Sequence, residues 1–200
     1  MNSQTEDLMV SKLRLLISSS VVCVASLVAS AQTIEYKVLA TNKTSTTQKE
    51  MNEAADAGFQ FGGVMGGETS FGGSEVVTIM YRRPSSEKGQ FTYKLLATSK
   101  TSTMQKELQE AGDEGFEYKG QTAYKSTFGG KEVVTILELD RKLKNRPRYE
   151  YRLLATKKTS TMQNELQEAG AAGFEFVGVT VGDTAMGGTE VVSILRRIAK

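Results

Sequence analysis

The stretch TSTMQKELQEAGDEGFE, residues 101–117, is written three times in this chain of 200 residues. It recurs as TSTTQKEMNEAADAGFQ at residues 44–60 and as TSTMQNELQEAGAAGFE at residues 159–175. Around each copy lies a longer repeated unit, which opens with Tyr-Lys/Arg-x-Leu-Ala-Thr and closes with Gly-Gly-x-Glu-Val-Val. Internal repeats take precedence over chain length in estimating domain number, so the sequence predicts three tandem modules.

The three modules align almost without gaps. Copies two and three align without any gap, so the same residue offset that relates Tyr93 to Tyr151 holds along the whole of both copies. Linkers containing Pro and charged residues separate the modules at residues 84–89 and 142–148. Units this small bury too little apolar surface to be stable alone, so we expect them to pack on one another. The predicted modules cover residues 34–83, 91–141 and 149–198.

Each module is predicted to begin with a strand and a helix. In copy two, Tyr93 and Leu95 alternate with polar residues, which is the period of a strand with one face buried. Met104 and Leu108 then lie four residues apart on one face of a helix. Gly115 tolerates the left-handed conformation that follows a last helical turn, so it should end the helix.

Two further strands complete the module. The third strand is apolar on both faces, with Val133 beside Val134, which is typical of a strand at the centre of a sheet. The two outer strands are then parallel to each other, and the helix is a right-handed crossover between them. The face of each sheet that lies away from its helix is also apolar and must be buried. Packing against another module is the simplest way to bury it. The predicted fold class is α+β: three tandem βαββ modules, each a three-stranded sheet with one helix on one face, packed with approximate threefold repetition, sheets inward and helices outward.

The start of each helix is the candidate binding site. Ser102 and Gln105 have the spacing of a capping box, as do their counterparts in the other copies. A Lys-Thr-Ser-Thr sequence also places a cation and hydroxyls where the free amides and the helix dipole favour an anion. Ordinary capping is the alternative explanation of the same residues. The candidate anion-binding residues are Lys43, Ser45, Lys100, Ser102, Lys158 and Ser160.

Glycine occurs inside two of the predicted helices, at Gly112 and Gly170. Each costs about 1 kcal/mol relative to Ala. This cost indicates that another backbone approaches closely there; a loosened last turn is the alternative.

The residue inventory favours a protein that is not an enzyme. The chain has no His, and its single cysteine, Cys23, lies in the N-terminal apolar run, which excludes His-based triads and His or Cys metal sites from the three modules. Glu107 and Glu110 could form a carboxylate pair, but a solvated helix face explains them as well. No cofactor is predicted. A net charge of +2, from 25 basic and 23 acidic residues, gives no support to a nucleic-acid partner.

The first 31 residues have the pattern of a secretory signal peptide. Lys12 and Arg14 precede an apolar run that ends in Ala-Ser-Ala at residues 29–31. Cleavage there would leave a mature chain that begins at Gln32 and is periplasmic or secreted. Met9 is an alternative start, and an uncleaved membrane anchor is the alternative to export. Membrane contact is expected only through this segment.

The repeated helix exit LQEAGDEGFE, residues 108–117, resembles a family of very short bacterial modules of unknown function. Their hallmark is a Tyr-Lys-Val strand, then a helix ending Leu-Asn-x-x-Gly-x-x-Gly, an aromatic residue, usually Trp, and Glu. This chain departs from it by having Ala55 for the first glycine of copy one, and Phe for Trp in every copy. The resemblance implies a fold and no activity. The βαββ order is also similar to that of dodecins, whose flavin is stacked by Trp; this chain has no Trp.

Together these patterns predict an exported, non-enzymatic binding or scaffold protein of the bacterial envelope. The alternative is a small-ligand or anion binder that uses the Lys-Thr-Ser-Thr loops. The sequence identifies no partner, and it leaves self-association open.

Overall fold

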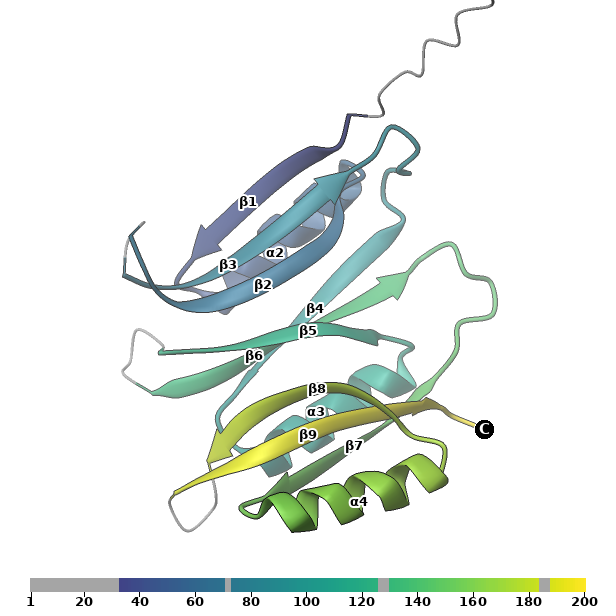
Figure 1. Ribbon diagram of the computed structural model, residues 1–200. Coiled ribbons are helices and arrows are strands. Elements are labelled where there is room, and N and C mark those ends of the chain that lie inside the picture. Colours follow the sequence, from purple (N-terminus) through teal and green to yellow (C-terminus); the bar gives the residue numbers. More distant parts are fainter. Residues whose placement is uncertain (1–32, 71–72, 126–129, 184–187) are drawn as a thin grey trace, which may run out of the picture. The chain divides into compact units, whose positions relative to one another are not determined.

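The computed structural model describes residues 33–70, 73–125, 130–183 and 188–200, which belong to one compact unit. The predicted signal segment lies outside the described residues. Module 1 contains β1 (Glu35–Thr41), α2 (Thr44–Asp56), β2 (Gln60–Thr69) and β3 (Gly73–Arg82) (Figure 1). Module 2 contains β4 (Phe91–Thr98), α3 (Thr101–Asp113), β5 (Glu117–Lys125) and β6 (Lys131–Asp140). Module 3 contains β7 (Tyr149–Thr156), α4 (Thr159–Ala171), β8 (Glu175–Asp183) and β9 (Thr189–Ile198).

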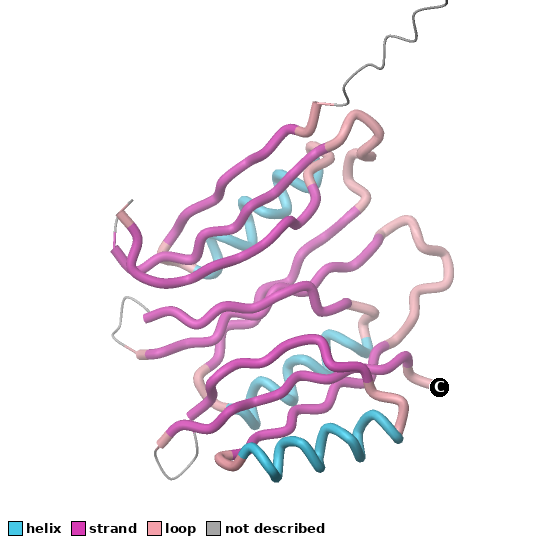
Figure 2. Tube along the Cα trace, viewed as in Figure 1, coloured by secondary structure: helices cyan, strands magenta, loops and turns pink. Residues whose placement is uncertain are grey.

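Each module has the predicted βαββ topology. The strand orders are β1-β3-β2, β4-β6-β5 and β7-β9-β8, and the central strand is antiparallel to both neighbours. Each helix joins the first and second strands of its own sheet (Figure 2). The second strand carries a β-bulge at the same place in all three copies, immediately before Gly63, Gly120 and Gly178. The predicted fold class is therefore confirmed.

The helices end as predicted but begin differently. Gly58, Gly115 and Gly173 have φ of 92°, 92° and 82°, and each is followed by a phenylalanine whose N–H bonds back to the helix. At the other end, Lys43, Lys100 and Lys158 are the N-caps, and no side chain caps these helices within the described residues. The predicted capping boxes are therefore wrong. The glutamines that would have closed the first two boxes bond instead to the next module.

The expectation that the helices face outward is wrong for α2 and α3. Helix α2 packs against β4 of module 2 as well as on its own sheet, and α3 packs in the same way against β7 of module 3. One apolar core therefore joins modules 1 and 2, with Met51 of α2 against Tyr93 and Leu95. A second joins modules 2 and 3, with Leu108 of α3 against Tyr151 and Ile194. The modules stack helix onto sheet because each sheet keeps one face free of its own helix.

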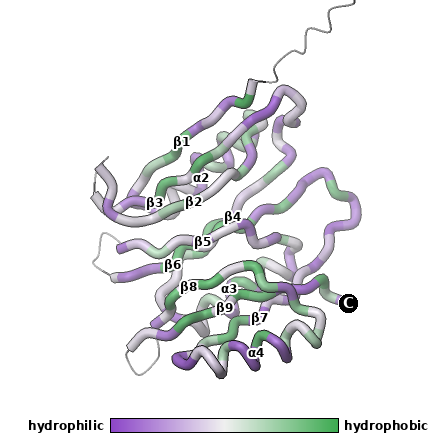
Figure 3. Tube along the Cα trace, viewed as in Figure 1, coloured by the Kyte–Doolittle hydropathy of each residue, from purple (hydrophilic) through white to green (hydrophobic). Residues whose placement is uncertain are grey.

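The linker after β6, residues 142–148, is mostly hydrophilic (Figure 3). Its first residue, Lys142, forms an ion pair with Glu87 of the preceding linker. Among the described residues, no helix has both the length and the apolar character needed to cross a membrane.

Candidate functional site

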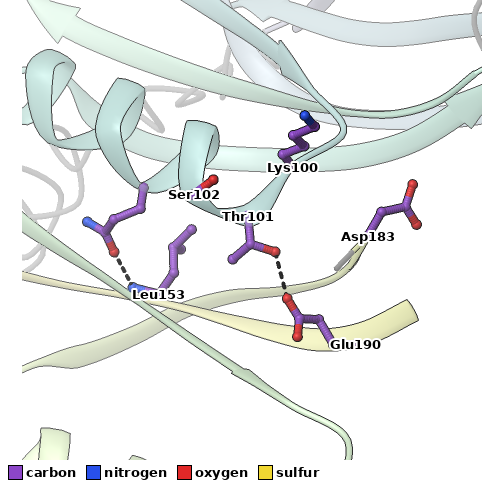
Figure 4. A pocket seen from close by; sticks show the side chains of 7 residues that line it. Lys100, Thr101, Ser102, Leu153, Asp183 and Glu190 are labelled. Carbon is purple, nitrogen blue, oxygen red and sulfur yellow. Dashed lines mark hydrogen bonds between the residues drawn. The ribbon is translucent and has the colours of Figure 1, made fainter. Parts of the chain in front are cut away.

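The predicted anion site of module 2 lines a pocket at the start of α3. Lys100 and Ser102 lie on its wall together with Gln105 of the same helix (Figure 4). The opposite wall comes from module 3 and contains Asp183 and Glu190. The Thr101 hydroxyl donates a hydrogen bond to Glu190 Oε1 at 3.0 Å. The two carboxylates offset the positive end of the helix dipole and would repel a bound anion. The pocket is therefore poorly suited to an anion.

The structure does not bring the remaining predicted site residues into this pocket. Within the described residues its lining takes only Lys100 and Ser102 from the predicted set. The other four lie exposed at the starts of α2 and α4: Lys43, Ser45, Lys158 and Ser160. The predicted sites are thus separate loops, one in each module.

Amide side chains of α2 bind the edge of the second sheet. Gln48 Oε1 accepts a hydrogen bond from the backbone N of Leu95 at 2.8 Å. One helical turn later, Asn52 Oδ1 accepts from the backbone N of Tyr93 at 2.8 Å, and its Nδ2 donates to the Tyr93 carbonyl at 2.9 Å. An edge strand exposes unpaired backbone groups, and these amides satisfy them.

The same contact recurs between α3 and the third sheet. Gln105 Oε1 accepts from the backbone N of Leu153 at 2.7 Å, and Gln109 Oε1 accepts from that of Tyr151 at 3.0 Å. These donors and acceptors occupy the repeat positions of Gln48, Asn52 and their partners. The module interface is therefore a repeated structure with a fixed register.

A buried tyrosine forms the centre of each interface. Tyr93 Oη accepts from the backbone N of Phe61 in module 1 at 2.9 Å, and Tyr151 Oη accepts from that of Tyr118 in module 2 at 2.7 Å. Tyr93 and Tyr151 are only 2% and 3% exposed. Burial, followed by the charge of Glu138, raises the pKa of Tyr93, and burial also raises the pKa of Tyr151. Both phenols therefore remain protonated donors at neutral pH.

Charged side chains surround these phenols. Tyr93 donates to Glu138 Oε2 at 2.7 Å, and Lys119 Nζ lies 3.1 Å from the other oxygen of this buried carboxylate. Across the second interface, Arg196 of module 3 lies 2.6 Å from Glu117 of module 2. The Arg196–Glu117 pair thus joins two modules, whereas Glu138 and Lys119 hold Tyr93 within module 2.

The two acids of the possible carboxylate pair differ, because Glu107 is half-buried and its Oε2 has no hydrogen-bond partner among the described residues. Glu110 lies on an exposed helix face, 3.8 Å from Lys106. Glu75 accepts a hydrogen bond from Thr69, and Glu190 accepts one from Thr101. In the part of the chain that the structure describes, no group of His, Cys, Asp and Glu side chains could hold a metal ion.

The head face, defined as Ile34, Tyr36, Val38 and Met65 around Gly63, is the open side of the first sheet. Its four large side chains are 37%, 67%, 57% and 52% exposed. Together with Ile79, Tyr81 and Arg83, part of this face forms a shallow pocket. In modules 2 and 3 the corresponding sheet face is covered by the helix of the preceding module.

Sequence reasoning missed the residues that join the modules. The sequence predicts a capping role for Gln105 and its counterparts, and it predicts no role for Gln109. The available signal was an amide residue at two positions one turn apart in every copy: Gln48 and Asn52, Gln105 and Gln109, and Gln163 and Gln167. Recurring amides rather than charged residues indicate a specific acceptor and donor nearby.

No protein-family model, curated protein or solved structure matches this chain. The resemblance to short bacterial modules therefore stays a prediction from the repeated helix exit.

Proposed function

We propose that this chain is a non-enzymatic, protein-binding scaffold exported to the bacterial envelope, and that the head face is its binding surface. One observation carries the proposal. Tyr36 is 67% exposed, whereas Tyr93 and Tyr151 at the same repeat position are 2% and 3% exposed because a neighbouring module covers them. Clustered exposed apolar side chains mark interaction sites.

The chemistry of the head face specifies the kind of partner. At the corresponding positions of modules 2 and 3, backbone N–H groups of the edge strand donate to two amide side chains of the preceding helix. The tyrosine hydroxyl accepts a hydrogen bond from a backbone N–H of the preceding module. A partner for Tyr36 and Val38 therefore presents a helix with amide side chains one turn apart and an aromatic residue on a neighbouring strand.

Site-specific photo-crosslinking tests the binding surface. A photoreactive phenylalanine analogue at position 34, at the rim of the head face, should form a covalent adduct with another protein chain in living cells. The same analogue at position 49 is the control, because the Lys49 side chain is 76% exposed on α2, away from the head face. An absence of protein adducts specific to position 34 would overturn the proposed surface.

Intact mass and cell fractionation test the export part of the proposal. A chain that begins at Gln32 and is recovered outside the cytoplasm is expected. If the chain keeps residues 1–31 and is found in the membrane fraction, the scaffold is anchored to the membrane and not released. A chain recovered from the cytoplasm would contradict export.

A further inference from the structure

We infer that the head face binds the tail face of a second copy of this chain. The tail face is defined as Gln163, Gln167 and Gly170 of α4 with Phe176, Val179, Val181 and Val191 of β8 and β9. The inference rests on the proposed function, because it names the partner of the same surface. The chain forms the same module interface twice, between modules 1 and 2 and between modules 2 and 3. The head face and the tail face are the two separate halves of this interface.

The exposed apolar residues are concentrated on these two faces. Among the described residues, ten large hydrophobic side chains are exposed, and eight of them belong to the head face or the tail face. Four are on the head face, and four are on the tail face: Phe176, Val179, Val181 and Val191. Such a distribution is expected where a stack of identical units has one uncovered face at each end.

The polar groups of the two faces complement each other in register. Gln163 and Gln167 are exposed and occupy the positions of Gln48 and Asn52, which bind Leu95 and Tyr93. The head-face residues at these two positions are Val38 and Tyr36. In a head-to-tail contact, Gln163 would therefore accept from the Val38 N–H and Gln167 from the Tyr36 N–H.

The tyrosine contact extends in the same way. In the first interface Tyr93 Oη accepts from the backbone N of Phe61, and Phe176 occupies the position of Phe61 in module 3. Tyr36 of one copy would thus accept from the Phe176 N–H of the other. Phe176 itself is 54% exposed, which leaves it free to pack across the contact.

The bulge glycines give an independent argument. A Cβ atom at Gly120 would lie 3.3 Å from the Phe61 ring, and one at Gly178 would overlap the Tyr118 hydroxyl, because an aromatic residue of the preceding module packs there. Gly63 holds the same place in module 1, yet no atom lies within 4 Å of where its Cβ would be. The head face thus keeps the recess without the aromatic residue that fills it elsewhere.

The helix glycines repeat this relationship at the other end. A Cβ atom at Gly112 would overlap the Tyr149 carbonyl and lie 2.9 Å from the Tyr151 ring. Gly170 is its counterpart on the tail face, where a Cβ atom would meet nothing within 4 Å. Glycine stabilises a helix less than alanine does, so an unneeded helix glycine is unfavourable. A second copy whose Tyr36 takes the place of Tyr151 accounts for this glycine.

Charge also fits the contact. Arg196 pairs with Glu117 between modules 2 and 3. On the tail face the position of Glu117 is held by the exposed Glu175, and on the head face Arg83 stacks on the Tyr81 ring at 4.7 Å. The repeat register places Tyr81 at the position of Arg196, so the Arg83 guanidinium on the Tyr81 ring would lie on the side of the contact that Glu175 faces.

Because the two faces differ, the contact is heterologous, and it generates rings or open chains rather than an isologous dimer. The test uses two variants of the full-length protein that each disable one face. Gly63→Leu fills the recess of the head face, where a Cβ atom meets nothing within 4 Å in the free chain. Phe176→Glu removes the aromatic residue of the tail face, and Ile198→Glu is its matched control, an apolar side chain 66% exposed outside both faces.

Sedimentation velocity over a wide concentration range gives the readout, with circular dichroism to verify folding. The unmodified chain and Ile198→Glu should associate as concentration rises, while each face variant alone should sediment as a monomer. A mixture of Gly63→Leu and Phe176→Glu should form a one-to-one dimer, because each supplies the face that the other lacks. This complementation is specific to a head-to-tail contact.

Three results would overturn the inference: a monomeric unmodified chain, association that persists in both face variants, or no dimer in the mixture. Association through residues 1–31 would produce the second of these. Failure here is distinguishable from failure of the proposed function. A monomer whose position 34 still crosslinks to a different protein would overturn the second-copy partner and leave the head face as the binding surface.

Discussion

Tyr93 Oη lies 2.9 Å from the backbone N of Phe61 and 2.7 Å from Glu138 Oε2, so one phenol joins modules 1 and 2. We expect Tyr93→Phe to lower the free energy of unfolding by about 1–3 kcal/mol, because the Phe61 N–H and one oxygen of the buried Glu138 carboxylate each lose a hydrogen bond. Urea unfolding measures the change. Tyr36→Phe, at the same repeat position but 67% exposed, is the control and should change the stability of the monomer by less than about 0.5 kcal/mol.

Alkaline pH should destabilise the fold through its buried tyrosines. Burial raises the pKa of Tyr118 to about 12, and the pKa values of Tyr93 and Tyr151 are raised as well. Since the folded pKa lies above the unfolded value of about 10, this stabilisation is complete below pH 10 and is lost as the pH rises through the folded pKa. Absorbance of tyrosinate should therefore rise in two phases, the later one together with unfolding. A single phase near pH 10 for all 7 tyrosines, with the fold retained, would contradict this prediction.

The helix amides should stabilise the fold only where a module follows them. We expect Gln109→Ala to destabilise the chain by about 1–2 kcal/mol, because the backbone N of Tyr151 and the carbonyl of Tyr149 lose a partner. Gln167→Ala, at the same position in α4, should be neutral for the monomer. Urea unfolding at low protein concentration compares the two, and equal losses would mean that the amide acts within its own helix.

The two helix glycines should respond oppositely to alanine. Gly112→Ala forces a methyl group against Tyr149 and Tyr151, so we expect a loss of about 1–3 kcal/mol despite the gain in helix propensity. Gly170→Ala has open space and should stabilise the monomer by up to about 1 kcal/mol. Thermal melting at low concentration gives both values. A stabilised Gly112→Ala would mean that the backbones are not in close contact there.

Phosphate titration tests the alternative hypothesis of anion binding at the helix starts. If the loops bind anions, the amides at the start of α2 should shift with added phosphate more than those of α3, because Asp183 and Glu190 line the second site. Glu190→Gln removes one of these charges and should increase the response of the α3 amides. Chemical shifts that do not change at any helix start would rule out this function.

The repeated stretch was sufficient to predict the module. The alternation at Tyr93 and Leu95, the apolar stripe of α3, and the helix-ending Gly115 are local patterns, and local backbone preferences act on them directly. The doubly apolar third strand placed β6 at the centre of its sheet, since only a central strand of a helix-covered sheet is buried on both sides. The capping prediction failed because each helix begins earlier than the capping box requires, with Lys100 and not Ser102 as the N-cap of α3. Gln105 of α3 then binds the edge of β7, which lies in another module.

The amino-acid sequence by itself determined the three βαββ modules, the helix exits and the absence of His from the whole chain. Only the tertiary structure decided that α2 and α3 lie between sheets and that Gln109 and Asn52 bind sheet edges. It also decided that no other described residues cover the faces around Tyr36 and Phe176. The physical reason is that the three copies share the residues that form the strand, the helix and its exit, so these local patterns do not distinguish an end from the middle. Tyr36 and Tyr93 hold the same repeat position, and among the described residues a preceding helix covers only Tyr93.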